Sequence, residues 1–356
     1  MKRSFSVLLV MSVASSLASC DGSGDEGGAP ISARGLFADA RTQTPSEGVE
    51  PYEIVAPLFS DYASKHRFIQ VPEGERITVG EDGYWDFPVG TILVKTFGFL
   101  VDARDPSLGE RVIETRLLIR EEDRWRPEVY IWNDDVSEAY LTPAGRIVPV
   151  SFIDAAGETV ELDYRVPSHT QCSNCHRSSD GLRLRPLGPR TSQMDRLHAY
   201  EGGMENQVDH LVAAGWLDAR PATDDVIIDY EAVRSDPEAT FEELDSAARS
   251  YLHANCSHCH RDGGPADQSG LFLEIEAMDR GHLGVCKITV SGGCDFGRAV
   301  IQPGDPDASM MVCRMESTEA GVKMPELPTV LAHTEGVDLI RRWIAAMPPD
   351  DCGFTD

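Results

Sequence analysis

The chain has 356 residues, of which 41% are hydrophobic, so it is long enough to bury the cores of two or three domains. Its 59 acidic and 32 basic side chains give a formal net charge of −27. This charge excludes nucleic acid and anionic lipid headgroups as electrostatic partners, and it favours a partner with a basic docking surface or simple solubility. Beyond the N-terminus, no apolar run reaches the roughly 18 residues needed to span a bilayer.

Residues 1–19 have the pattern of a lipoprotein signal peptide, with a charged start, an apolar stretch and small residues before a cysteine. The stretch Leu17-Ala18-Ser19-Cys20 resembles a bacterial lipobox, which predicts cleavage before Cys20 and lipidation of its thiol. An ordinary cleaved signal is the alternative. Residues 20–44 are expected to form a flexible lipid-anchored tether. The chain is therefore expected on the periplasmic side of a bacterial membrane, and Asp21 slightly favours the inner membrane.

Residues 45–165 are expected to form a β-rich domain, because short apolar or alternating stretches recur between Gly, Asp and Pro residues. Six strands with turn signals between them predict a sandwich or barrel-like sheet. The predicted strands cover residues 68–71, 91–97, 115–120, 129–132, 147–150 and 160–164.

The pattern changes to helices after residue 165, which predicts a multidomain α+β chain. Residues 166–217 form a first segment, residues 218–238 an acidic, Pro-containing linker, and residues 239–356 a second domain. Each of the two larger segments contains one Cys-x-x-Cys-His motif.

The two motifs, Cys172-Ser173-Asn174-Cys175-His176 and Cys256-Ser257-His258-Cys259-His260, have the spacing of c-type haem attachment sites. Two thiols at this spacing add to the two vinyl groups of one porphyrin, and the next residue, a histidine, ligates the iron. A zinc site and a thioredoxin-like redox pair are the alternatives. Haem attachment outside the cytoplasm explains the motifs and the export signal together, which zinc does not, and a thioredoxin-like pair would need a βαβ pattern that is absent here. We therefore expect two covalently bound haems, with Cys172 and Cys175 on the first and Cys256 and Cys259 on the second.

The first segment leaves one axial ligand open. His176 is expected to be the proximal ligand of the first haem. The loop Pro186-Leu187-Gly188-Pro189 resembles one in small cytochromes in which a proline carbonyl accepts the imidazole N–H. Either no protein side chain is the distal ligand, which leaves the iron open to a substrate, or the ligand is one of four residues on predicted helices: Met194, Met204, His198 and His210.

Other polar residues near the motifs have weaker assignments. His258 is expected to be a solvent-facing spacer. Arg183, Arg185 and Arg190 are candidates for pairing with haem propionates, and surface charge is the alternative explanation.

The second domain resembles class I cytochrome c. Thr240 and Glu243 predict a capping box that opens a helix ending at the second motif, and Thr334 predicts the start of a C-terminal helix. The resemblance implies that His260 and Met324 are the axial ligands of the second haem. It also implies that the two helices cross near two aromatic residues, Tyr251 and Trp343. The rival methionines Met310, Met311 and Met315 lie in a predicted helix, where at least two are expected to be core.

Four cysteines remain outside the lipobox and the motifs: Cys286, Cys294, Cys313 and Cys352. An even number in an exported chain predicts two disulfides. The preferred pairing joins Cys286 to Cys294 and Cys313 to Cys352, and the two other pairings stay open.

From about residue 35 onward, the chain resembles a largely uncharacterised family of exported bacterial dihaem c-type cytochromes with a β-rich region before the haems. The resemblance implies two haems and an electron-transfer role, and it implies no substrate. It depends on the stretches Pro57-Leu58-Phe59-Ser60-Asp61-Tyr62, Phe87-Pro88-Val89-Gly90-Thr91, Tyr130-Ile131-Trp132-Asn133-Asp134, Pro186-Leu187-Gly188-Pro189, Pro303-Gly304-Asp305-Pro306 and Met324-Pro325.

Three functions fit these features. The favoured one is electron transfer between an extracytoplasmic donor and a respiratory acceptor. The second is a dihaem peroxidase-type enzyme with an open first haem, although the motifs lie late in the chain for that class. The third is a haem-bearing subunit whose β-rich domain docks a dehydrogenase or a polymer-degrading system.

Overall fold

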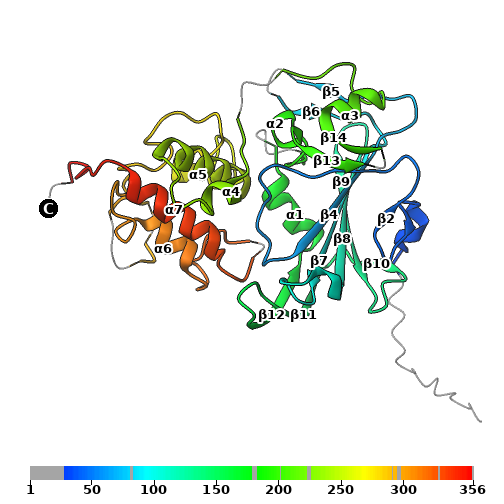
Figure 1. The fold of residues 1–356 in the computed structure, drawn as a ribbon, viewed down its shortest axis with the longest axis horizontal. Coiled ribbons are helices and arrows are strands. Elements are labelled where there is room, and N and C mark those ends of the chain that lie inside the picture. Colours follow the sequence, from blue (N-terminus) through cyan, green and yellow to red (C-terminus); the bar gives the residue numbers. More distant parts are fainter. Residues whose placement is uncertain are drawn as a thin grey trace, which may run out of the picture.

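The protein has two lobes, one built on a β-sheet and one mainly helical, as the computed structural model shows (Figure 1). The structure describes residues 28–80, 83–178, 183–200, 202–222, 226–290, 292–294, 298–327 and 329–354. The predicted α+β class is confirmed. Within these ranges, no helix is both long enough and apolar enough to cross a membrane. The predicted signal peptide and Cys20 lie outside the described residues.

A six-stranded antiparallel sheet, in the order β10-β9-β8-β7-β4-β3, is the centre of the first lobe. All six predicted strands are found, and most are longer than expected. Four of them belong to this sheet, and the other two form a separate two-stranded ribbon. The order ends at β10 and β3, which do not pair with each other, so the sheet is not closed into a barrel. The bounds of its strands are Glu50–Pro51 (β3), Ser64–Gln70 (β4), Ile92–Leu100 (β7), Glu110–Arg120 (β8), Trp125–Trp132 (β9) and Ala139–Leu141 (β10).

One face of the sheet is covered by the segment that precedes it. The 3₁₀ helix η1 (Ile31–Arg34) and the strands β1 (Phe37–Asp39) and β2 (Thr44–Pro45) lie there. Ile31 and Leu36 are almost completely buried against sheet residues that include Phe68 and Leu117. The prediction of a flexible tether over residues 20–44 is therefore wrong for residues 31–44, because apolar side chains fix that part to the sheet.

The opposite face is covered by two different layers. At one end lies the two-stranded ribbon β11 (Arg146–Ile153) and β12 (Thr159–Val166), whose Phe152 and Tyr164 pack on Phe99. At the other end lies the first motif segment, whose Met194 shares a core with Ile69 of β4. This segment is thus part of the sheet lobe and has no separate core of its own. A small pair of strands, β5 (Thr78–Val79) and β6 (Trp85–Asp86), joins the same end.

The first motif segment contains fewer helices than expected. Its helices are α1 (His169–His176), α2 (Thr191–Met194) and α3 (Gln207–Ala213). Residues predicted as helical between α2 and α3 form a hairpin, β13 (Leu197–Tyr200) paired with β14 (Gly203–Asn206). Gly203 has φ +121°, a conformation that a helix does not allow and that other residues rarely adopt, so it ends the helical pattern here.

The helical lobe consists of α4 (Tyr230–Arg234), α5 (Phe241–Asn255), α6 (Met310–Glu316) and α7 (Thr334–Ala346). The predicted capping box of Thr240 and Glu243 is present at the start of α5. Short 3₁₀ turns, η2 (Pro106–Leu108) and η3 (Asp267–Ser269), lie in the loops of the two lobes. Tyr230, placed in the predicted linker, is buried in this core, so the linker is shorter than expected.

Helices α5 and α7 pack closely because a glycine faces an aromatic ring. A Cβ atom at Gly336 would lie 2.2 Å from the Tyr251 hydroxyl oxygen. Further along, the Trp343 indole N–H donates to Asp245 at 2.9 Å. Tyr251 and Trp343 are both buried, and each contacts the other helix, Tyr251 at Gly336 and Trp343 at Asp245.

The four remaining cysteines form two disulfides, but the preferred pairing is wrong. Cys286 bonds to Cys352 and Cys294 bonds to Cys313. The first bond ties the C-terminal tail to the loop after the second motif. The second ties that same loop to α6. The preferred pairing assumed that Cys286 and Cys294 close a short loop between them. Instead, each of these cysteines joins the loop to another part of the chain, Cys286 to the C-terminal tail and Cys294 to α6.

Candidate functional site

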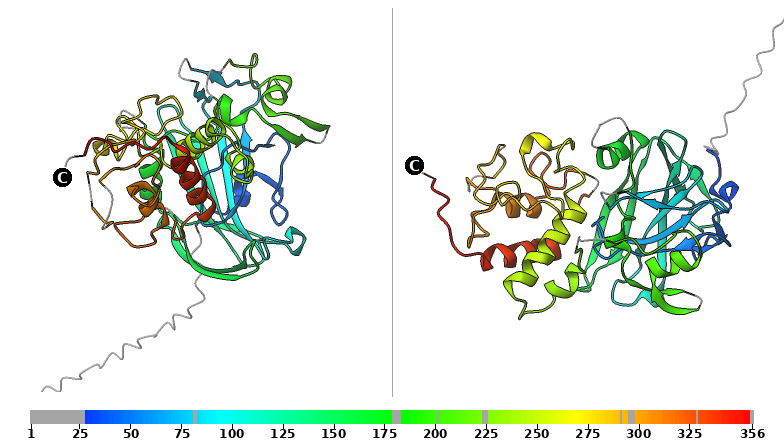
Figure 2. Two further views of the ribbon diagram at one scale, coloured as in Figure 1. Left: turned by 60° about the vertical axis from the view of Figure 1, so that its left-hand side comes forward. Right: turned by 90° about the horizontal axis from the view of Figure 1, so that it is seen from above.

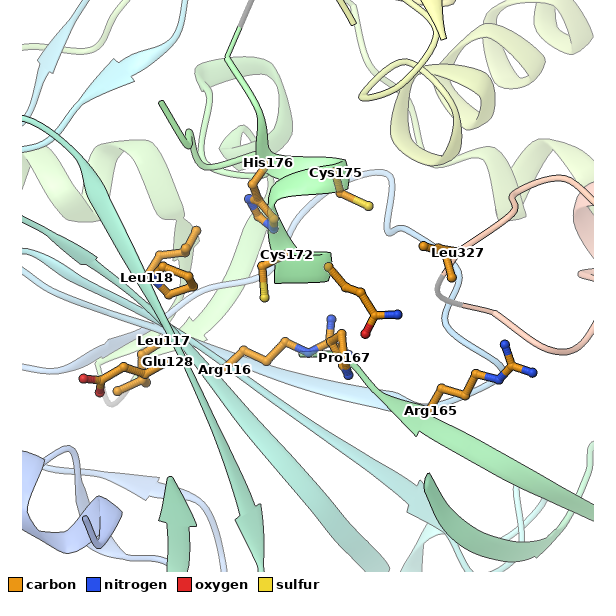
Figure 3. Close-up of a pocket in the computed structure, with 12 residues that line it drawn as sticks. Arg116, Leu117, Leu118, Glu128, Arg165, Pro167, Cys172, Cys175, His176 and Leu327 are labelled. Atoms are coloured by element: carbon orange, nitrogen blue, oxygen red, sulfur yellow. The ribbon is translucent and has the colours of Figure 1, made fainter. Parts of the chain in front are cut away.

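The first motif lies on α1, which covers the sheet on the side facing the helical lobe (Figures 1 and 2). Ser168 and Gln171 form a capping box that starts this short helix. The helix carries all three chemically important side chains within two turns. Figure 3 shows that Cys172 and His176 point from α1 toward the sheet, whereas the Cys175 thiol points to the other side.

His176 is held in one tautomer. Its Nδ1 lies 2.8 Å from the Arg185 carbonyl oxygen. A carbonyl only accepts, so Nδ1 carries the hydrogen and the Nε2 lone pair is left for a metal. Burial lowers the pKa of His176 to about 4, which keeps the ring neutral. The expectation of a proline carbonyl is wrong by one residue, because the acceptor directly precedes Pro186.

Two cavities lie side by side next to His176. The smaller is lined by Cys172, Cys175 and residues of β8 and β9 (Figure 3). The larger encloses about 1250 Å³, including space open to solvent. Both share His176 and Cys175 in their walls. The larger is lined mainly by apolar groups, including Leu93, Phe97 and Leu118, so its size and lining suit a large flat apolar ligand bearing a few charged groups.

Three basic side chains from neighbouring strands of the sheet lie in a row in the wall of the larger cavity. Arg67 of β4, Lys95 of β7 and Arg116 of β8 are direct cross-strand partners. All three line the cavity. Arg67 Nη1 donates to Glu53 at 2.9 Å, and Arg116 Nε donates to Glu114 at 2.9 Å. Glu53 and Glu114 compensate the two arginines, so the row places one amine, that of Lys95, between two ion pairs in the wall of the cavity.

The second motif follows α5 directly. Cys256 is the C-cap of that helix, and burial raises the pKa of its thiol to about 12. His260 Nδ1 lies 3.1 Å from the Ser269 hydroxyl, whose own hydrogen is donated to the Ala266 carbonyl at 2.6 Å. The hydroxyl must therefore accept from His260, which again leaves Nε2 free for a metal. Burial lowers the pKa of His260 to about 4.

The two motifs are in direct contact. The Cys259 thiol donates to the Asn174 carbonyl at 3.8 Å, and Arg261 donates to the Arg177 carbonyl. A hydrogen bond with the Cys259 thiol, together with burial, raises the pKa of Cys175 to about 12. Within the described part of the chain, the cysteines outside disulfides are the four motif cysteines. Two potential attachment sites thus meet at the junction of the lobes.

Met324 lies in the loop between α6 and α7. Its side chain is half-buried, and its backbone N–H donates to the Arg314 carbonyl at 2.8 Å. The Arg314 charge also contributes to lowering the pKa of His260, after burial and His258. The rival methionines Met310, Met311 and Met315 are all buried in the helical lobe, as expected of core residues.

None of the four distal candidates for the first haem lines the cavities beside His176. Met194 is fully buried in the sheet-lobe core. Met204 is 64% exposed on β14. His198 lies against Tyr200, and His210 stacks on the same ring at 3.6 Å and bonds to Glu205.

Some cavity residues differ from the sequence expectations. Of the three arginines proposed for propionates, Arg185 lines the larger cavity. Arg190 is buried and pairs with Glu276 at 2.6 Å, and Arg183 is exposed. His258 is buried and lines the larger cavity, so the expectation of a solvent-facing spacer is wrong.

The cation row is absent from the sequence expectations because charged residues on strands usually face water. A signal is nevertheless present. In β7, Lys95 falls on the same alternation face as Leu93 and Phe97, which are core-type residues. A lysine at an apolar position of a central strand indicates a cavity or a buried partner.

Comparison with known proteins gives no relative. No protein-family model, no curated protein and no solved structure significantly matches this chain.

Proposed function

We propose that the chain is a dihaem c-type cytochrome that transfers electrons on the periplasmic side of a bacterial membrane. The observation that carries the proposal is the contact between the two Cys-x-x-Cys-His motifs, through Cys259 and Asn174, at the junction of the lobes. Electron transfer between two redox groups requires that they lie close together. Two attachment motifs in contact satisfy that requirement, and a single isolated motif would not.

The residues present fit two covalent haems. Each motif offers two thiols outside disulfides and one histidine with a free Nε2 lone pair. Haem, when bound, supplies a one-electron couple at its iron. The chain orients each imidazole through Arg185 or Ser269, and the sheet excludes water with Leu93 and Phe97. Arg185, which also lines the larger cavity, would pair with a carboxylate such as a haem propionate.

The location and partners follow from the sequence pattern. The lipobox ending at Cys20 supports a lipid-anchored protein, with the inner membrane slightly favoured. The net charge of −27 supports a redox partner with a basic docking surface and opposes nucleic acid.

The experiment that separates a carrier from a peroxidase-type enzyme is ligand binding by the reduced protein. We expect that purified protein, with both haems attached and reduced, binds no carbon monoxide and consumes hydrogen peroxide no faster than a small cytochrome c of the same haem concentration. Stoichiometric carbon monoxide binding at one haem, with rapid peroxide turnover, would overturn the electron-carrier proposal in favour of the enzyme.

A further inference from the structure

Lys95 occupies an unusual place in the larger cavity. It lies on the central strand β7, between Arg67 and Arg116, and its side chain lines the same cavity as His176. His176 projects from α1 into this cavity, and the Lys95 side chain enters it from the sheet. The lysine and the histidine therefore face the same space from opposite walls, one from the sheet and one from α1.

Among the side chains that the structure describes, the Lys95 amine has no hydrogen-bond acceptor. Its nitrogen lies over the Phe97 ring, 4.9 Å from the ring centroid. Arg67 and Arg116, its neighbours in the row, have carboxylate partners in Glu53 and Glu114. An amine so placed among cations and apolar groups loses its proton readily, and burial followed by the charge of Arg67 lowers the pKa of Lys95 well below its ordinary value. A neutral amine has a lone pair that can bind a metal.

Two other side chains in the cavity are worse placed to be metal ligands. His258 contacts the Cys175 thiol, which is an attachment point and hence marks the edge of a bound porphyrin. His253 accepts a hydrogen bond at Nδ1 from the Ile275 N–H at 3.1 Å, and the charge of Arg190 acts on it more strongly than that of any other group.

We propose that the Lys95 amine is the second axial ligand of the first haem, with His176 as the other. This inference rests on the proposed attachment of a haem at Cys172 and Cys175. It replaces the four candidates that the structure places elsewhere, and it closes the first iron to exogenous ligands. The first haem would then have nitrogen ligands on both sides, whereas the second would have a nitrogen and the Met324 sulfur.

The test compares two lysine variants of the full exported protein. Lys95→Ala removes the proposed ligand. Lys65→Ala is the matched control. Lys65 lies on the same face of the sheet, on the neighbouring strand β4, and burial lowers its pKa to about 7. Unlike Lys95, it does not line the cavity. Electron paramagnetic resonance of the oxidised proteins, carbon monoxide binding of the reduced proteins and the intact mass of each sample are measured together. The mass reports whether both haems are attached, independently of ligation.

We expect Lys95→Ala to convert one of the two low-spin haems to high spin and to bind one equivalent of carbon monoxide, while wild type and Lys65→Ala stay fully low-spin and bind none. An unchanged low-spin spectrum in Lys95→Ala, with two haems attached, would overturn the ligand assignment and leave the dihaem proposal intact. A mass without haem at the first motif in wild type would overturn the proposed function itself.

A second variant keeps the test valid if Lys95→Ala does not fold. Lys95→His retains a nitrogen ligand of a different kind. We expect it to stay low-spin and to shift the near-infrared charge-transfer band of one haem, since that band depends on the chemical type of the axial ligands. No shift in Lys95→His would also contradict the assignment.

Discussion

The two Cys-x-x-Cys-His regions carry the same motif on very different supports. The second is held by a core that is local in sequence: every buried member of it except Ala56 lies between residues 227 and 347. The first has no such core. Its Met194, Val208 and Leu211 pack on Ile69 and other residues of the sheet region. The same chemistry is thus built once on a nearly self-sufficient helical lobe and once on the face of a sheet.

This difference has a functional consequence. In the proposed dihaem protein, the loop methionine Met324 would give the second haem a ligand from its own segment. The first haem would depend on the strands of the sheet, which place Arg67, Lys95 and Arg116 in the wall of its cavity. The two haems would therefore have different ligands, potentials and roles, although the motifs are nearly identical.

Separating the two regions should give the largest effect. We expect residues 226–356, produced alone with the export signal and haem attachment machinery, to fold and bind one haem. Residues 166–217 produced in the same way should bind none stably, because their apolar side chains have lost the sheet. Absorbance of the purified fragments and their intact mass measure this. A haem-loaded, soluble fragment 166–217 would contradict the comparison.

Within the second region, the close packing of α5 against α7 can be tested by one substitution. We expect Gly336→Ala to lower the free energy of unfolding of the helical lobe by about 3 kcal/mol, because its Cβ would lie 2.2 Å from the buried Tyr251 hydroxyl. Denaturant unfolding monitored at the second haem measures this. Gly202→Ala is the control, since a Cβ there meets no atom within 4 Å. Equal, small effects of the two substitutions would refute the close packing.

The junction of the lobes predicts a pH dependence. Burial lowers the pKa of His333, which stacks on Phe59 at 4.2 Å, to about 4. Between the ordinary histidine pKa and this value, only the unfolded chain takes up the proton, so stability falls as pH falls. From pH 6.5 to pH 5, His333 contributes about 2 kcal/mol to this loss, so the loss should be smaller by that amount in His333→Gln.

The contribution of His66 to stability changes with pH in the opposite direction, so His66 serves as the control for this measurement. The His66 imidazole donates a hydrogen bond to the Glu110 carboxylate, which raises the pKa of His66. Its contribution to stability is complete at low pH and is lost as pH rises through the raised pKa. Denaturant unfolding at several pH values should therefore show that His66→Gln reduces stability mainly at low pH. The same sign for both variants would contradict these environments.

The smallest predicted effect concerns how each imidazole is oriented. The acceptor for His176 is a backbone carbonyl, but the acceptor for His260 is the Ser269 hydroxyl, which a substitution can remove. A hydrogen bond of this kind contributes about 1 kcal/mol, so Ser269→Ala should raise the potential of one haem by up to about 40 mV. Redox titration measures the shift. Ser178→Ala, in the first region, should leave both potentials unchanged.

Much of the second region could be predicted from sequence because its signals are local. The capping box of Thr240 and Glu243, the apolar period of α5 and the start of α7 at Thr334 are all found as expected. The six strands were likewise visible in their alternation. The disulfide pairing could not be predicted from sequence, because Cys286 and Cys352 are 66 residues apart and the fold of the whole lobe brings them together.

The first region could not be predicted to the same depth because its site is non-local. His176 lies on α1, but the opposite wall comes from strands that precede it by about 50 to 110 residues in the chain. The methionine and histidine candidates are close to the motif in sequence, but the hairpin at Gly203 takes Met204 and His198 away from the site. Cross-strand register, which sets Arg67, Lys95 and Arg116 in one row, is a property of the folded sheet.

The covalent haem count of the exported protein tests the central claim most directly. We expect the intact mass of the wild-type chain to include two haems. The double variants Cys172→Ser with Cys175→Ser and Cys256→Ser with Cys259→Ser should each include one. A wild-type mass with no haem, from cells that attach haem to a control cytochrome, would contradict the account.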